Sequence, residues 1–258
     1  MKSAEYHAHP ALSKGMLDKL HAAPAKLKAW LDGDRPDPTP AMLFGTAFHA
    51  AVLEPHLLIE APKFDKRTTA GKAAAAEFNP PPDSVVVDPI THAKVTAMRE
   101  SVMAHPAARR LLTKGQPEVS VFSRLGNTEV KCRPDWLHND GIIVDLKSTD
   151  DASPAGFSRS CANYRYHVQA AWYLDVCQSQ DINAEVFVLI ACEKSPPYLV
   201  GTYVIDARDL QRGRDEYQRD LDTYRECVET NEWPGYSNRI EVINLPRWAT
   251  KEESCLQY

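Results

Sequence analysis

The sequence predicts an α/β (α+β) fold in which helices flank a mixed central sheet. Up to residue 114 the chain reads as helices interrupted by prolines. After Gly115 the apolar residues recur with a period of two, which is typical of strands. From there the order is three strands, a helix, two strands and a final helix. An order of this kind covers the faces of a sheet with helices.

The first part of the chain predicts helices over residues 13–21, 24–31, 42–54 and 90–112, the last interrupted near Pro106. Ser13 is a suitable N-cap for the first of them. In the segment 42–54, Phe44, Phe48 and Ala51 follow helical spacing and mark a buried stripe. His49 lies beside this stripe rather than on it.

The second part predicts strands over residues 118–124, 128–137, 142–148, 184–193 and 198–205, with helices over 163–178 and 206–231. The continuous apolar run in 142–148 favours a central strand. We expect one domain over 1–258, made of a mostly helical part (1–114), a βββαββα core (115–232) and a C-terminal tail (233–258).

Composition excludes several classes of protein. The chain is 43% hydrophobic and 25% charged, which is ordinary for a globular domain. No stretch approaches the roughly 20 apolar residues that cross a bilayer, and no apolar secretory segment is present near Met1. We therefore expect a cytoplasmic protein with no membrane partner. None of the six cysteines forms a C-x-x-C pair, which argues against a zinc ribbon.

The formal net charge of −5 does not by itself indicate a nucleic-acid-binding protein. The local potential at a site matters more than the total charge. Any DNA binding must therefore be argued from particular residues.

Residues 138–141 read as a tight hairpin turn in which Gly141 takes the left-handed position. This turn places His138 opposite Ile142 and, counting back, Asp135 opposite Asp145. Directly opposed residues lie about 4.5–5.5 Å apart at Cβ, and like charges there destabilise a sheet. A divalent metal ion between the two carboxylates would explain the pair.

Asp145 and Lys147 are two residues apart on the same predicted strand, so both side chains point to one face. Two carboxylates and an ammonium group suit a site for Mg²⁺, with Mn²⁺ as a substitute. The alternative is a cross-strand ion pair between Asp135 and Lys147 on a solvated face. Pro134 also favours an edge or a bulge, which could shift the register.

Three weaker candidates accompany this pair. His49 could complete a metal shell, although a lone helical histidine is more often structural. Glu118 could reach a second metal ion, although an exposed strand carboxylate is the simpler interpretation. Gln169 and Tyr173 lie four apart on one helical face that can pack beside the site.

These residues occur in the order Gly45-x-x-x-His49, Asp135, Asp145-Leu146-Lys147 and Gln169-x-x-x-Tyr173. In this order they resemble the motifs of PD-(D/E)xK nucleases of the RecB-like branch. Within that branch the chain is most similar to the RecE-type exodeoxyribonuclease VIII nuclease domain and its phage homologues. Further similarity lies in residues 12–17, 67–72, 131–135, 233–236 and 245–248. Asp145 stands where the family more often has glutamate, an accepted variant.

The resemblance implies a restriction-endonuclease-like core with N-terminal helical additions. It assigns metal ligation to His49, Asp135, Asp145 and the backbone carbonyl of Leu146, and transfers least securely to Glu118. It makes Lys147 the catalytic lysine, and it gives Gln169 and Tyr173 a role in supporting the site or touching DNA.

The same resemblance implies a Mg²⁺-dependent, ATP-independent exonuclease that degrades one strand of linear double-stranded DNA in the 5′→3′ direction. It also implies a homo-oligomeric ring (trimer or tetramer) and a single-strand annealing protein as partner in recombination. A basic channel could track phosphates with the side chains of Lys63, Lys66, Arg67 and Lys72. A solvated surface loop explains these four basic residues equally well. Arg133 is a further candidate for DNA contact. The alternatives are an endonuclease or flap nuclease on the same core and a catalytically silent DNA-binding module.

Overall fold

The computed structural model describes residues 1–65 and 67–245. Its helices are α1 (Ser3–Ala8), α2 (Lys14–Ala22), α3 (Pro24–Leu31), α4 (Pro40–Leu53), α5 (Thr69–Glu77), α6 (Pro89–Ala104), α7 (Pro106–Leu111), α8 (Pro154–Asn163), α9 (Tyr166–Gln178) and α10 (Ala207–Thr230). Its strands are β1 (Leu58–Glu60), β2 (Val85–Val87), β3 (Gly115–Pro117), β4 (Val121–Leu125), β5 (Thr128–Cys132), β6 (Trp136–His138), β7 (Ile142–Thr149), β8 (Val186–Glu193) and β9 (Val200–Val204).

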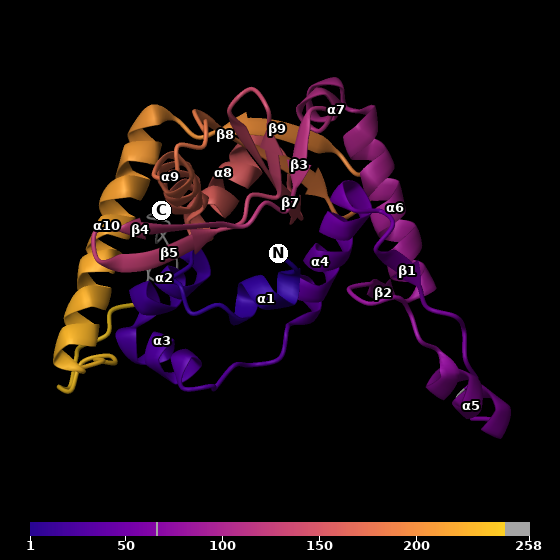
Figure 1. Cartoon of the computed structure of the whole chain (residues 1–258), viewed down its shortest axis with the longest axis horizontal. Helices are drawn as coiled ribbons and strands as arrows, with labels where there is room; N and C mark the ends of the chain where they lie inside the picture. The colour runs from indigo at the N-terminus through magenta and orange to yellow at the C-terminus, as the bar shows by residue number, and fades with distance from the viewer. Residues whose placement is uncertain (66, 246–258) are drawn as a thin grey trace, which may run out of the picture.

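A five-stranded mixed sheet forms the centre of the molecule, with the strand order β3-β6-β7-β8-β9. Strands β7 and β8 pair in parallel, whereas the other neighbours are antiparallel. Helices α4 and α6 lie on one side of this sheet, and α9 and α10 lie on the other (Figure 1). The predicted fold class and the central position of β7 are therefore confirmed.

Both faces of β7 are buried, and alternate residues enter different cores. Val144 and Leu146 are fully buried in the core that α4 and α6 cover. Ile143 is fully buried in the core that α9 covers. Because side chains alternate along a strand, Asp145 and Lys147 lie on the face of Ile143, toward α9.

Several predicted boundaries are wrong. The predicted strand 128–137 is two strands, β5 and β6, because the chain leaves one sheet and enters another at residues 133–135. Glu118 lies outside the strands, with φ of +53°, and not within a strand over 118–124. Helix α8 was not predicted. Ser13 is the N-cap of α2 as predicted, but its hydroxyl makes no capping hydrogen bond.

Two smaller units lie beside the main sheet. Strands β4 and β5 form a separate antiparallel pair, and β1 and β2 form a short parallel pair. Between β1 and β2 the chain extends outward and carries α5 at its tip (Figure 1). No residue of α5 is buried. Among the described residues, no helix has both the length and the apolar character required to span a membrane.

Candidate active site

The site begins where the chain crosses from β5 to β6 through Pro134. Pairing between β6 and β7 starts at His138 opposite Ile142, as predicted, and its last pair is Trp136 opposite Val144. Gly141 in the turn has φ of +79°, the left-handed conformation that the hairpin required. Asp135 is next in this register, opposite Asp145, but it lies beyond the last pair.

Because the pairing of β6 with β7 ends at Val144, the backbone of Leu146 has no strand partner on that side of β7 and contacts side chains instead. Its N–H donates to Asp135 Oδ2 at 2.7 Å. Its carbonyl oxygen lies 3.0 Å from His49 Nε2, and His49 Nδ1 lies 3.5 Å from Asp135 Oδ2. His49, from α4 on one face of the sheet, thus meets Asp135 at the open edge of β7.

Glu118 joins this group, since ligand atoms of His49, Glu118 and Asp135 lie within 4.8 Å of one another. Burial raises the pKa of Asp135 to about 7, and the nearby charge of Asp145 adds to that effect. Burial also raises the pKa of Glu118. Carboxylates in such surroundings need a cation to keep their charge.

This donor set fits a divalent metal ion. The carboxylates of Glu118 and Asp135 and the carbonyl of Leu146 are oxygen ligands of the kind that Mg²⁺ and Mn²⁺ prefer. The imidazole of His49 adds a nitrogen ligand beside them. Of the predicted ligands, His49, Asp135 and the Leu146 carbonyl are thus brought together. Glu118, the least secure prediction, lies in the same group.

Asp145 contacts two side chains next to this group. Its side chain is 1% exposed and accepts a hydrogen bond from Gln169 Nε2 at Oδ1, at 2.5 Å. Its other oxygen forms an ion pair with Lys147. Asp145 is therefore positioned to orient Lys147, and its role as a metal ligand stays a prediction.

Helix α9 supplies the support for Lys147. The Lys147 ammonium lies over the ring of Tyr166, 4.6 Å from its centre. Burial opposes the charged form of Lys147, but the nearby Asp145 and Asp135 outweigh it and raise its pKa. Tyr166 was missed from the sequence, although it stands three residues before Gln169 and so shares its helical face.

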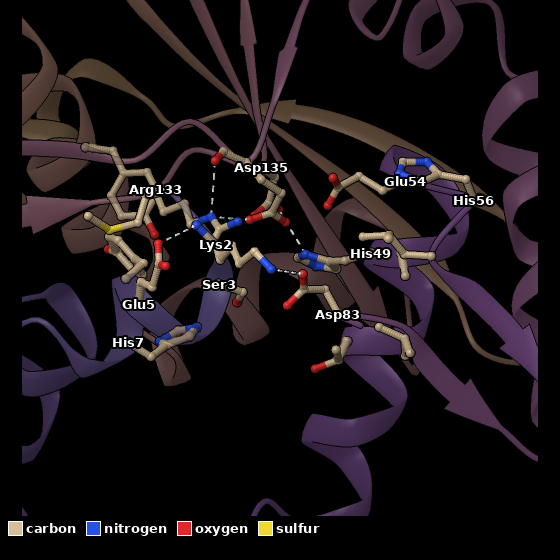
Figure 2. A pocket seen from close by; sticks show the side chains of 18 residues that line it. Lys2, Ser3, Glu5, His7, His49, Glu54, His56, Asp83, Arg133 and Asp135 are labelled. Carbon is tan, nitrogen blue, oxygen red and sulfur yellow. Dashed lines mark hydrogen bonds and ion pairs between the residues drawn. The ribbon is translucent and has the colours of Figure 1, made fainter. Parts of the chain in front are cut away.

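A cavity of about 860 Å³ opens in front of His49, Glu118 and Asp135, and Tyr173 contributes to its wall as predicted. Figure 2 shows His49, Asp135 and Arg133 pointing toward this space. Helix α1 forms the opposite wall, where Lys2 pairs with Asp83 at 2.9 Å (Figure 2). No pattern in the sequence indicated that α1 would take part.

The predicted DNA contacts fall in two places. Arg133 lines the cavity and pairs with Glu118 at 2.8 Å, and its Nη1 is buried without a hydrogen-bond partner in the described chain. Arg67 and Lys72 instead belong to the projecting segment around α5 (Figure 1), where Arg67 pairs with Asp65 at 2.9 Å. Lys63 precedes that helix, and Lys66 lies outside the described residues.

Comparison with solved structures shows one with a similar fold among those that match. It is a protein from Eubacterium rectale described as a "putative exonuclease", with a TM-score of 0.65 and 14% sequence identity over 95% of this chain and 96% of that chain. Another match, SSO0001, has a TM-score of 0.30 and 12% identity over 70% of this chain and 86% of that chain, and supports no further argument. None of the curated proteins compared with this sequence matches it.

A protein-family model matches most of the chain. It matches residues 13–246 and is described as a PDDEXK-like domain of unknown function (DUF3799). The matched range contains every residue of the metal-ligand group and of the Asp145–Lys147–Gln169 cluster. The chain therefore belongs to the PDDEXK-like family DUF3799.

Proposed function

We propose that this protein is a Mg²⁺-dependent exonuclease that degrades one strand of linear double-stranded DNA. The observation that carries this proposal is the convergence of His49, Asp135 and the Leu146 carbonyl on one edge of β7, with Lys147 two residues after Asp145 on the same strand. The family match to PDDEXK-like domains and the likeness to a protein described as an exonuclease support it.

The metal ion would be held by His49, Asp135, Asp145 and the Leu146 carbonyl, with Glu118 as a further ligand. When bound, it would polarise a phosphodiester oxygen and lower the pKa of a water molecule. Around it, the protein supplies fixed charges that require no rearrangement during the reaction.

Lys147 stabilises negative charge that develops on the phosphate. Its ammonium stays protonated because Asp145 and Asp135 raise its pKa. Asp145, held by Gln169, and the ring of Tyr166 restrict where that ammonium can go. Arg133, which pairs with Glu118 at the wall of the cavity, adds positive charge near the bound phosphate.

From the family resemblance we further propose ATP-independent digestion in the 5′→3′ direction. The same resemblance leads us to propose a homo-oligomeric ring and a single-strand annealing protein as partner in recombination. Analytical ultracentrifugation of the purified protein tests the ring, because a purely monomeric species would contradict it.

The function is tested by incubating blunt linear duplex and closed circular duplex with the protein, with Mg²⁺ or with a chelator. We expect digestion of the linear duplex only, only with Mg²⁺, and earlier release of a 5′ label than of a 3′ label. Digestion of circles would establish the endonuclease alternative, and earlier release of the 3′ label would reverse the direction.

Variants connect this activity to the site. Lys147→Ala removes the charge beside the phosphate, and we expect a loss of activity of about 10²-fold or more. Lys194→Ala is the matched control, because Lys194 also pairs with an aspartate, Asp150, but at an exposed turn after β8. Wild-type activity in Lys147→Ala, or absence of any digestion by the wild type, contradicts the proposal.

A further inference from the structure

Two stacked tyrosines extend from the catalytic lysine to the surface. The ring of Tyr166 lies under the Lys147 ammonium, 4.6 Å from it. The ring of Tyr164 stacks on that of Tyr166, with centres 5.7 Å apart and planes at 23°. Tyr164 is 62% exposed. Two contacts therefore connect the reacting region to an exposed aromatic face at the turn between α8 and α9.

This turn is held rigidly. Arg165, between the two tyrosines, has φ of +53°, a left-handed conformation that is uncommon for residues other than glycine. Its guanidinium binds three carboxylates, at 3.0, 3.3 and 2.7 Å, from Asp18, Glu216 and Asp220. Lys14 of α2 also donates to the carbonyl oxygen of Tyr164 at 2.8 Å. The backbone that presents Tyr164 is thus determined by contacts with α2 and α10, while its ring remains open.

An exposed aromatic ring on a fixed backbone is well suited to nucleobase stacking. Every base has a flat π face, so such a contact tolerates any sequence. A rigid platform also loses little conformational freedom when it binds. A base inside a duplex is already stacked on both faces, so it must separate from the duplex before it can stack on the ring of Tyr164.

We propose that the exposed face of Tyr164 binds an unpaired nucleobase, carried by a nucleotide next to the phosphate that Lys147 contacts. This inference rests on the proposed nuclease function and specifies its substrate: a DNA end whose terminal nucleotides have separated. Tyr164 contacts the bound strand and not the reacting atoms. Its contribution is present before and during the reaction, so its loss raises KM and leaves kcat unchanged.

The test uses DNA with 2-aminopurine at an unpaired end position, because stacking on an aromatic ring quenches its fluorescence. Binding is measured in a chelator, so that no strand is cut, and KM and kcat are measured separately with Mg²⁺. For Tyr164→Ala we expect loss of the quenching and an increase in KM of about tenfold, which corresponds to one lost base–aromatic stack. Tyr164→Phe and Tyr164→Trp keep a flat ring and should keep both properties.

Tyr236→Ala is the matched control. Tyr236 is 75% exposed and also lies near a lysine, Lys26, at 5.4 Å, but on the segment after α10 and not at the site. It should behave like the wild type. Circular dichroism of Tyr164→Ala checks the fold, and Tyr164→Ser provides a second substitution without a ring.

If Tyr164→Ala is folded and shows the same quenching and the same KM as the wild type, the stacking proposal is overturned. The nuclease function is not affected by that result, provided that the wild type digests DNA. Equal quenching of a 2-aminopurine inside the paired duplex also overturns the stacking proposal, because the platform would not be selecting an unpaired base. If the wild type digests no DNA, the nuclease proposal fails instead, and the binding measurement still reports on Tyr164.

Discussion

Replacing Gln169 by methionine tests how the buried carboxylate of Asp145 is held. Methionine keeps the approximate volume of the side chain but removes the amide that donates to Asp145 Oδ1 at 2.5 Å. The acceptor is an ionised group that is 1% exposed, so water cannot replace the lost donor. A hydrogen bond to a charged group contributes about 1.5–3 kcal/mol to the free energy of unfolding. For a chain of this size, a loss of about 2 kcal/mol lowers Tm by roughly 4–8 °C.

Gln178→Met on the same helix is the control. Gln178 Nε2 donates at 2.6 Å to the backbone carbonyl of Ala184, a neutral acceptor, and the residue is exposed. Its loss should lower the free energy of unfolding by about 1 kcal/mol or less. Urea denaturation of both variants, in chelator, measures the difference.

A double-mutant cycle isolates the interaction with the charge. In an Asp145→Asn background, Gln169→Met should reduce stability by about 1 kcal/mol less than it does in the wild type, because the acceptor is no longer ionised. If Gln169→Met has the same effect in both backgrounds, the amide does not stabilise the Asp145 charge, and the support we assign to Lys147 is wrong.

Three further outcomes follow from the site. Because the pKa of Asp135 is about 7 when folded and near 3.8 when unfolded, the metal-free folded state retains a proton that the unfolded state loses. In chelator, the free energy of unfolding should therefore decrease as the pH rises from about 4 to about 7, by at most about 1.4 kcal/mol per pH unit. Mg²⁺ should raise Tm more at pH 8 than at pH 6, because the metal ion binds the deprotonated carboxylate. Calorimetry measures both trends, and Asp135→Asn should flatten them. Arg133→Met removes the cation that pairs with Glu118 at 2.8 Å beside the cavity, so KM for duplex should rise several-fold. It also leaves the part-buried Glu118 carboxylate without its partner, so Tm in chelator should fall. An unchanged KM would exclude Arg133 from DNA binding. If the projecting segment contacts phosphates, replacing both Arg67 and Lys72 by glutamate should weaken duplex binding and reduce its dependence on salt concentration. An unchanged salt dependence would exclude that segment from DNA binding.

Local patterns in the sequence predicted much of the site. The hairpin at Gly141 set the register of β6 against β7, because turn length and the period of two leave little freedom. Helical spacing predicted that Phe48 is buried and that Gln169 faces the site. The ordered motifs led to the family that the family model supports.

Other features depend on contacts between distant parts of the chain. Pro134 suggested an edge, but only the packing of two separate sheets shows that the chain changes sheet there. That change leaves the Leu146 N–H free to donate to Asp135 and its carbonyl free to contact His49, a residue far earlier in the chain. The contacts of Asp145 with Lys147 and Gln169 also depend on this packing, because Gln169 comes from a helix later in the chain.

The sequence by itself identified the candidate site residues, because periodicity, turn geometry and motif order can be recognised along the chain. Only the tertiary structure decided what each of them touches. The stack of Tyr164 on Tyr166 needs a turn that Asp18 of α2 and Asp220 of α10 hold through Arg165. Residues so far apart in sequence meet only when the sheet and its helices have packed.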